Sequence, residues 1–347
     1  MRRARGDEEG VVLLLVLVVI VLTIVSVYAF ARTTILDVVG LRQGILRDRA
    51  ELLARSGLEI AQRALADDLS RADTHPLAAQ TETLLDAWAI LGEEPIEVPG
   101  GGELRISIRD SGSRFNLNAL LDSDGEPLSD SKPFLEAALE RIIDNMPGRP
   151  EEKFYEPEEL ADAILDWIDS NDTTRLGDDE VSTYERMRAA GSPLERPLFT
   201  LAELAGLPGM DAPLLAELEQ YFTPYPLFPI FQNAGVNPNT APTHVLGLIY
   251  YGTADDMALA TQDDVYRILR AREDGRVFCS GAADERCVTF ASEIGRAGET
   301  VFPPLQLSSN VFNIESRATV AGATFRIVAT VDRTEPASPR MLEFQVE

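Results

Sequence analysis

The longest apolar stretch of the chain lies close to its N-terminal end. Within residues 11–30, only Thr23, Ser26 and Tyr28 carry polar side-chain atoms. At about 1.5 Å per residue, a helix of this length spans the roughly 30 Å hydrocarbon core of a bilayer. Three arginines precede the run and no charged residue interrupts it. The positive-inside rule therefore predicts a cytoplasmic N-terminus and places everything after Arg32 across the membrane.

Two kinds of N-terminal segment compete for this run. A cleaved secretory signal has an apolar region of only about 7 to 15 residues and ends at a small-residue cleavage site. The run here is longer and continues into helical sequence without a break, so hydropathy favours an uncleaved anchor. Hydropathy leaves Gly10 unexplained, because this glycine stands between a short charged leader and the apolar segment.

The helical pattern continues beyond the anchor through residues 32–70. Apolar or small residues recur there at spacings of three and four, charged residues occupy the other positions, and no proline interrupts the segment. This pattern predicts one long helix whose second half packs along a single face. The positions of that face are Leu46, Ala50, Leu53, Gly57, Ile60 and Ala64.

Strand patterns occur once early and three times late in the chain. Residues 103–110 alternate between apolar and polar, which is typical of a strand with one buried face. A short helix is predicted before them, at 84–91. Strand sequence returns at 311–320, 324–331 and 341–346, and the region between is mostly helical in pattern. We therefore predict an α+β protein, in which a long N-terminal helix packs on an antiparallel sheet and a large all-α domain is inserted into that sheet.

Two segments of the predicted insertion look like helix-hairpin-helix units. Residues 201–221 read helix, Leu-Pro-Gly hinge, helix, and residues 236–272 give a similar pair in which Thr240 is a candidate N-cap. DNA-binding units of this type hold a phosphate near basic residues. No lysine or arginine lies between Arg196 and Arg267, so packing or protein contact is the favoured role of these units.

The charge balance points the same way. The chain of 347 residues has a formal net charge of -26, from 57 acidic and 31 basic residues. Such a body repels phosphate backbones, so nucleic acid is not expected as a partner. The only cysteines, Cys279 and Cys287, flank a short polar loop. In an oxidising compartment they would pair as a disulfide, and two free structural cysteines remain the alternative.

The densest group of oxygen side chains follows a predicted helix that ends near residue 169. Because so many carboxylates repel one another, a cation such as Ca²⁺ would relieve the loop, and the scarcity of His and Cys disfavours a transition metal. Composition alone supports a solvated acidic loop equally well. The candidate ligands are Asp169, Asn171, Asp172, Asp178, Asp179 and Glu180.

The sequence offers little for catalysis. It contains no serine paired with a histidine base, no histidine cluster and no glycine-rich phosphate loop. The carboxylates Asp166 and Asp169 could in principle exchange protons, but they are helix neighbours beside an exposed acidic run. We therefore expect a protein that is not an enzyme.

Several short motifs, in their order along the chain, resemble one family. They are DSGSRFNLNAL at 110–120, AILDWID at 163–169, the acidic cluster ending in Tyr184, LPGM at 207–210 and VNPNTA at 236–241. Together with the glycine-ended leader, they resemble the general secretion pathway protein K family, the minor pseudopilins K of bacterial type II secretion systems.

The resemblance implies processing and a domain plan. It implies that the prepilin peptidase cleaves after Gly10, that Val11 is then N-methylated, and that calcium binds near the acidic loop. The plan would be a leader at 1–10, a transmembrane part at 11–31, a first pilin-like part at 32–117, an inserted helical domain at 118–300 and C-terminal strands at 301–347.

The resemblance also implies a location and partners. The protein would be a single-pass inner-membrane subunit with a periplasmic body, at the tip of the pseudopilus that promotes export of folded proteins across the outer membrane. Its partners would be other minor pseudopilins, the major pseudopilin and the prepilin peptidase, with secreted cargo or the secretin as further candidates. Leu15 occupies the fifth mature position, where major pseudopilins carry a glutamate. The alternatives are a membrane-anchored DNA receptor and a minor pilin of a type IV pilus.

Overall fold

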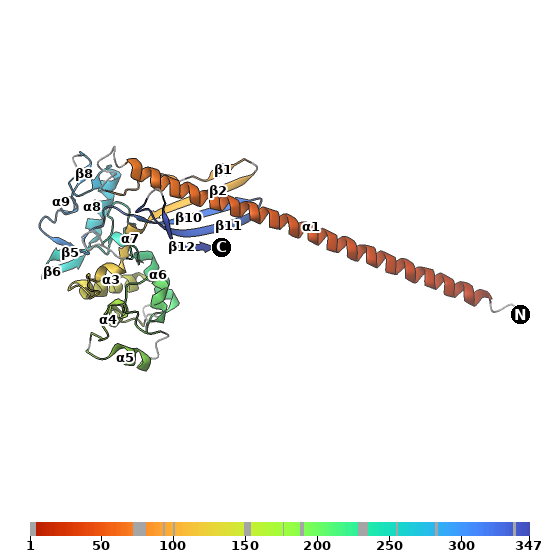
Figure 1. Ribbon diagram of the computed structural model, residues 1–347, viewed down its shortest axis with the longest axis horizontal. Helices are drawn as coiled ribbons and strands as arrows, with labels where there is room; N and C mark the ends of the chain where they lie inside the picture. The colour runs from red at the N-terminus through yellow and green to blue at the C-terminus, as the bar shows by residue number, and fades with distance from the viewer. Residues whose placement is uncertain are drawn as a thin grey trace.

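One continuous helix dominates the architecture (Figure 1). The structure is a computed structural model, and it describes residues 5–71, 81–92, 94–99, 101–148, 154–175, 177–187, 191–227, 235–254, 256–281, 284–335 and 338–347. Helix α1 (Arg5–Arg71) runs through the apolar segment and onto the globular body. Its segment from Gly10 to Leu69 is the one helix of the described residues that is long and apolar enough to cross a membrane. The predicted long helix is therefore present, and it ends one residue later than predicted.

The second half of α1 packs on a five-stranded antiparallel sheet of order β1-β2-β10-β11-β12. These strands are β1 (Ile96–Val98), β2 (Gly102–Asp110), β10 (Val311–Val320), β11 (Ala323–Asp332) and β12 (Arg340–Val346). Alternate residues of β2, β10 and β11 are buried on the face that α1 covers. The four predicted strands are thus confirmed, and β1 escaped prediction because three residues are too few for a period to emerge.

Small residues on α1 allow the helix to lie close to the sheet. Ala50, Ala54 and Ala61 are fully buried. At Gly57, an added Cβ would stand 2.8 Å from Leu104 Cδ1 on β2, well inside van der Waals contact. The predicted face was only partly right: Ala50 and Gly57 are buried, but Ile60 is 41% exposed. The buried face of the helix instead includes Ala54, Leu58, Ala61 and Leu65.

A second domain is inserted between β2 and β10, which pair with each other although almost 200 residues separate them. Its own hydrophobic core is distinct from the core beneath α1. The helices are α3 (Ser131–Asn145), α4 (Pro157–Ile168), α5 (Glu180–Arg186), α6 (Ala212–Tyr221), α7 (Thr243–Leu246), α8 (Gln262–Glu273) and α9 (Phe290–Glu293), with short 3-10 turns η1 (Ser111–Ser113), η2 (Leu117–Leu120) and η4 (Leu201–Gly206). The short helix α2 (Ala87–Ile90) precedes β1 and is half the predicted length.

The insertion also contains short strands, so the prediction of an all-α insertion was wrong in that respect. A small antiparallel sheet joins β5 (Tyr250–Thr253), β6 (Asp256–Leu259) and β9 (Thr300–Phe302), and two parallel pairs join β3 (Phe115–Asn116) to β4 (Phe222–Thr223) and β7 (Val277–Phe278) to β8 (Cys287–Val288). None exceeds four residues, which is too short for alternation to stand out in the sequence. The α+β class of the whole chain is confirmed.

The two predicted helix-hairpin-helix units fared differently. Residues 201–221 form the 3-10 turn η4, a hinge and α6, close to the prediction. Residues 236–272 are not a helical pair, because the β5–β6 hairpin separates α7 from α8. Thr240 is not an N-cap: its hydroxyl donates to Asp110 Oδ2 at 2.6 Å, and Pro242 holds the cap position of α7.

Candidate functional site

Three buried carboxylates meet where α4 ends and α5 begins. Asp166 lies in the last turn of α4, Asp169 is its C-cap, and Glu180 is the first residue of α5. Their side chains can each offer an oxygen within 4.8 Å of the others. The residues are 5%, 1% and 0% exposed, respectively. Two sets of contacts fix this geometry. The apolar face of α4 is buried in the core, and the rings of Trp167 and Tyr184 pack with centroids 5.4 Å apart.

This triad, Asp166, Asp169 and Glu180, is short of positive charge. Among the described residues the one cationic group within ion-pair distance is Arg175, whose Nε lies 3.5 Å from Asp166 Oδ1. Asp169 Oδ1 and both carboxylate oxygens of Glu180 have no hydrogen-bond partner among the residues that the structure describes. A buried polar atom without a partner is costly, and a charged one more so. Binding of a proton or a cation would therefore stabilise the site.

The pKa values of the three carboxyl groups are raised for the same reason. Burial, followed by repulsion from Asp166, raises the pKa of Asp169 to about 7. Burial and repulsion from Asp169 and Asp166 raise the pKa of Glu180 to about 8. Burial raises the pKa of Asp166 to about 6, against the pull of Arg175. An oxygen-only donor set of this kind fits a hard cation such as Ca²⁺, and no nitrogen or sulfur ligand belongs to it.

The six residues singled out from the sequence separate into two groups. Asp169 and Glu180 converge in the triad, and Asn171 touches it, because its Nδ2 donates to Asp169 Oδ2 and to Glu126 Oε2 at 3.0 Å each. The side chains of Asp172, Asp178 and Asp179 are exposed instead. Asp179 accepts a hydrogen bond from Ser182 N and so caps α5.

Asp166 was missing from the predicted ligand set. The sequence predicts Asp166 and Asp169 only as a possible acid-base pair, yet their spacing of three places both carboxylates on one side of the end of α4. Glu180 reaches the same point because the intervening loop folds back, with Glu180 N donating to Asp172 O at 3.1 Å. Helical periodicity can predict that Asp166 and Asp169 lie together, whereas the position of Glu180 depends on the path of the loop.

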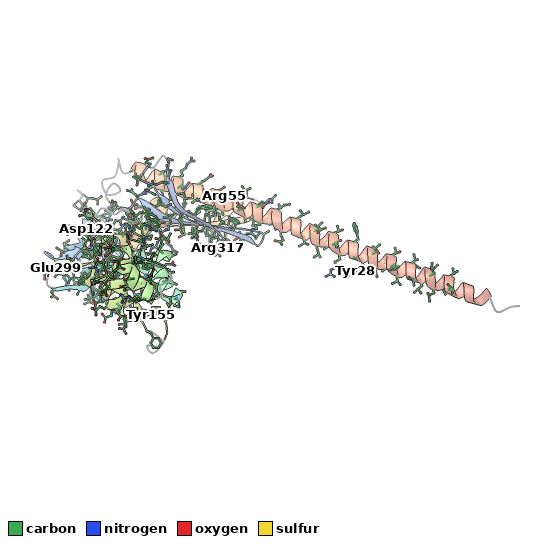
Figure 2. All side chains as sticks on the ribbon, turned by 60° about the horizontal axis from the view of Figure 1, so that its bottom comes forward. Tyr28, Arg55, Asp122, Tyr155, Glu299 and Arg317 are labelled. Carbon is green, nitrogen blue, oxygen red and sulfur yellow. A yellow bond between two sulfur atoms is a disulfide. The ribbon has the colours of Figure 1, made fainter. Side chains whose placement is uncertain are left out.

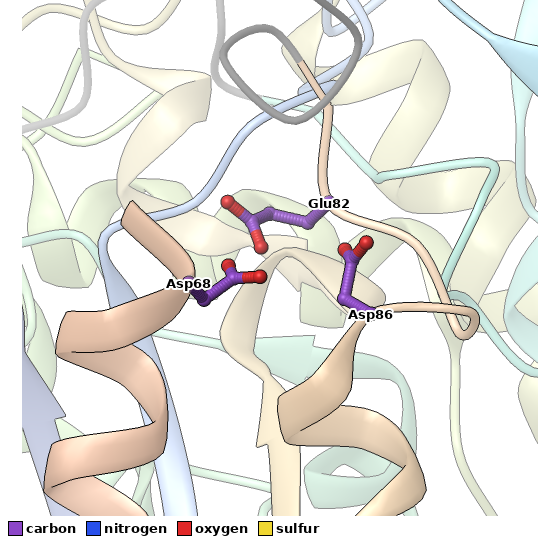
Figure 3. Close-up of side chains that lie close together, drawn as sticks. All are labelled: Asp68, Glu82 and Asp86. Atoms are coloured by element: carbon purple, nitrogen blue, oxygen red, sulfur yellow. The ribbon is translucent and has the colours of Figure 1, made fainter. Parts of the chain in front are cut away.

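A second carboxylate group, Asp68, Glu82 and Asp86, lies at the end of α1 (Figure 3). In this group an arginine side chain supplies the positive charge. Arg333 is 1% exposed, forms an ion pair with Glu82 and donates from Nη1 to Asp68 Oδ2 at 2.9 Å. Trp88 Nε1 donates to Glu82 Oε2 at 3.1 Å. Even so, burial raises the pKa of Glu82 to about 8. This group ties α1 to the end of β11 and has a structural role.

The remaining candidate residues lie elsewhere. Gly10, Val11 and Leu15 stand on the exposed surface of α1, and residues 1–4 of the predicted leader lie outside the described residues. Cys279 and Cys287 are joined in a disulfide next to the β7–β8 pair.

A long, exposed apolar helix that continues onto an antiparallel sheet, with a second domain set between two paired strands, defines a pilin-like, membrane-anchored protein. Residues 113–227 match the family model for protein K of the type II secretion system. The type II secretion system protein K of Klebsiella pneumoniae is 29% identical over 120 residues. That match covers 35% of each protein, so it spans about a third of the curated relative.

The fold agrees with a solved structure, the GspK-GspI-GspJ complex from the type 2 secretion system of enterotoxigenic Escherichia coli. The likeness has a TM-score of 0.59 at 21% sequence identity and covers 88% of this chain and 99% of that one. Residues 113–227 are thus similar to protein K of the type II secretion system, and the fold agrees over most of the chain. The predicted family resemblance is thereby confirmed.

Proposed function

We propose that the chain is a minor pseudopilin that caps the periplasmic pseudopilus and so promotes export of folded proteins across the outer membrane. The position of the inserted domain carries this proposal. It lies at the C-terminal end of α1, opposite the apolar half of the helix (Figure 1). In a filament whose subunits stack along their N-terminal helices, this bulk would obstruct any subunit above. A cap tolerates that obstruction, whereas a repeating subunit does not.

The fifth mature position supports the same role. If the leader ends at Gly10, this position is Leu15, an exposed apolar residue. A subunit without a carboxylate there cannot pair with the N-terminal amine of a neighbour above it. Gly10 stands on an exposed part of α1, and no atom beyond its chain neighbours and the backbone of its own helical turn lies within 4 Å of where its side chain would be.

A direct test is to label the subunit on isolated pili. Pili assembled with an epitope-tagged copy should carry gold label at one end only, while label against the major pseudopilin runs along the whole length. Tagged subunit distributed along the shaft would overturn the role as a cap.

We propose further that the triad binds Ca²⁺ through carboxylate oxygens of Asp169, Glu180 and Asp166. The support is the three orphaned oxygens of Asp169 and Glu180, which a divalent cation would satisfy. The cation would supply the missing positive charge and fix the loop between α4 and α5. Because the triad is buried, the role proposed for this cation is structural.

A DNA receptor is the weaker reading, for a specific reason. At the hinge before α6, where DNA-binding relatives would hold a phosphate, Asp211 caps the helix by accepting from Leu214 N at 2.9 Å. The same carboxylate accepts from the hydroxyl of Tyr155. An anion at this helix start would meet a carboxylate already in place.

A further inference from the structure

Three arginines form a row across the face of the sheet that points away from α1. In register, Arg317 on β10 stands directly opposite Arg105 on β2 and directly opposite Arg326 on β11. The neighbouring residue Ser316 points the other way, because its hydroxyl donates to Ala54 O on α1 at 2.8 Å. The arginine row, Arg105, Arg317 and Arg326, therefore lies on the outer face, where Arg317 is labelled in Figure 2.

Three glutamates lie beside the three arginines of the row, but the ion pairs are shared unevenly. Arg105 pairs with Glu103 at 2.6 Å, and Arg326 pairs with Glu315 and Glu347 at 2.9 and 2.6 Å. The side chain of Arg317, at the centre, forms no ion pair or hydrogen bond within the described parts of the chain. Like charges placed directly opposite each other across an antiparallel pair destabilise a sheet. Folding alone gives no reason to keep this arrangement.

The row also borders a hollow on an open part of the sheet. Arg105 and Arg317 line a depression of about 380 Å³ together with Glu103, Thr319 and Thr324. The opposite end of the same face is covered by the inserted domain, where Arg114 donates to Asn313 Oδ1 at 2.7 Å and Thr330 is 2% exposed. The open end therefore offers a shallow, polar hollow at which two arginines face one glutamate.

We propose that the arginine row docks a carboxylate-rich segment of a companion pseudopilin. This inference rests on the proposed function. The chain has a net charge of -26, so a hollow in which Arg317 lacks an ion-pair partner can select one orientation of an acidic neighbour. Charge complementarity, rather than apolar burial, is the recognition that a lining of arginine, glutamate and threonine can provide.

The distance from the bilayer disfavours a lipid headgroup as the bound anion. The sheet end that carries the row packs near Leu53, because a Cβ at Gly102 would stand 3.2 Å from Leu53 Cδ2. Leu53 lies about 20 residues beyond the predicted membrane segment, and at about 1.5 Å per residue this is about 30 Å along α1. Lipid headgroups of the anchoring membrane do not reach that far, whereas a neighbouring subunit does.

The test uses the full-length chain in detergent with each purified companion minor pseudopilin of the same system. Affinity is measured at low and high salt for the wild type, Arg317→Glu and Arg105→Glu. The control is Arg270→Glu, which makes the same charge change at an exposed arginine of α8 that has no ion pair among the described residues. We expect Arg317→Glu to weaken one companion about tenfold or more at low salt, with the control within about twofold.

A second readout separates docking from folding. Arg317→Glu removes two opposed like-charge contacts, so the melting temperature of the isolated variant should be equal to or above that of the wild type even as binding falls. Unchanged affinity for every companion would overturn the docking role and leave the cap function standing. Loss of self-association alone, or binding of inorganic phosphate alone, would show that a companion pseudopilin is not the partner of the arginine row. If the wild type bound no companion at all, the proposed function would fail together with this inference.

Discussion

Replacing Glu180 with glutamine should make the protein less stable than the wild type in calcium, but not in chelator. Glutamine keeps the shape of the side chain but removes one negative charge and one carboxylate ligand. In the presence of Ca²⁺ the wild type gains the full set of ligands and the variant does not. In chelator the wild type buries three carboxylates beside a single arginine. The variant buries two and gains an amide donor that can meet Asp169 Oδ1, which has no partner among the described residues.

The magnitude follows from burial and from linkage. Glu180 is 0% exposed and both its oxygens lack partners, and each such group costs about 1–3 kcal/mol. A cation held at about a hundred times its dissociation constant stabilises the folded state by about 2.7 kcal/mol. At about 2–4 °C per kcal/mol, chelation should lower the wild-type melting temperature by about 5 to 10 °C.

The assay is thermal unfolding at pH 8 with calcium or with chelator. We expect Glu180→Gln to melt below the wild type in calcium, and at or above it in chelator. The control is Glu185→Gln on the exposed side of α5, which should follow the wild type in both conditions. If Glu180→Gln were destabilised equally in both, the carboxylate would act through packing and the calcium proposal would be refuted.

Three more outcomes follow from the structure. Because burial raises the pKa of Asp169 to about 7 and of Glu180 to about 8, the metal-free folded state holds protons that the unfolded chain releases from about pH 4 upward. Its stability therefore falls as the pH rises through that window, so chelator should lower the melting temperature more at pH 8 than at pH 5; an equal effect would contradict this. Arg333→Met strips Asp68 and Glu82 of their cation and should cost about 3–5 kcal/mol in urea unfolding, and a loss below about 1 kcal/mol would count against it. Gly57→Ala should destabilise by about 1–3 kcal/mol, since buried Ser316 and Leu104 leave no room for a methyl group, while Gly44→Ala on open helix should be neutral or stabilising; equal effects would show that α1 does not approach the sheet so closely.

Long periodic segments were predictable from the sequence because their patterns repeat many times. Helix α1 and the strands β2, β10 and β11 each carry several periods of one apolar face. The strands β5 and β6 have only four residues each, too few for a period to show, and the sequence instead predicts a helical pair across the tyrosines of β5. Tertiary contacts decided that segment: Tyr251 donates from its hydroxyl to Asp264 Oδ2 on α8 at 2.5 Å.

The candidate site was only half predictable for a related reason. Composition located the acidic loop, and the spacing of Asp166 and Asp169 follows from helical geometry. Which of the loop carboxylates turns inward depends on the backbone path between residues 170 and 179, which brings Glu180 N to Asp172 O. Asp178 and Asp179 have the same chemistry as Glu180 but remain in solvent. Sequence chemistry therefore predicts a class of ion, and the fold determines which carboxylates converge.

Mass spectrometry of the mature N-terminus tests the central claim most directly. If the chain is a processed pseudopilin, protein recovered from cells with an active prepilin peptidase begins at Val11 and carries an N-methyl group, and peptidase-deficient cells retain the leader through Gly10. A chain that keeps residues 1–10 in both strains, or that is cut at another position, would make α1 a permanent anchor and contradict the account.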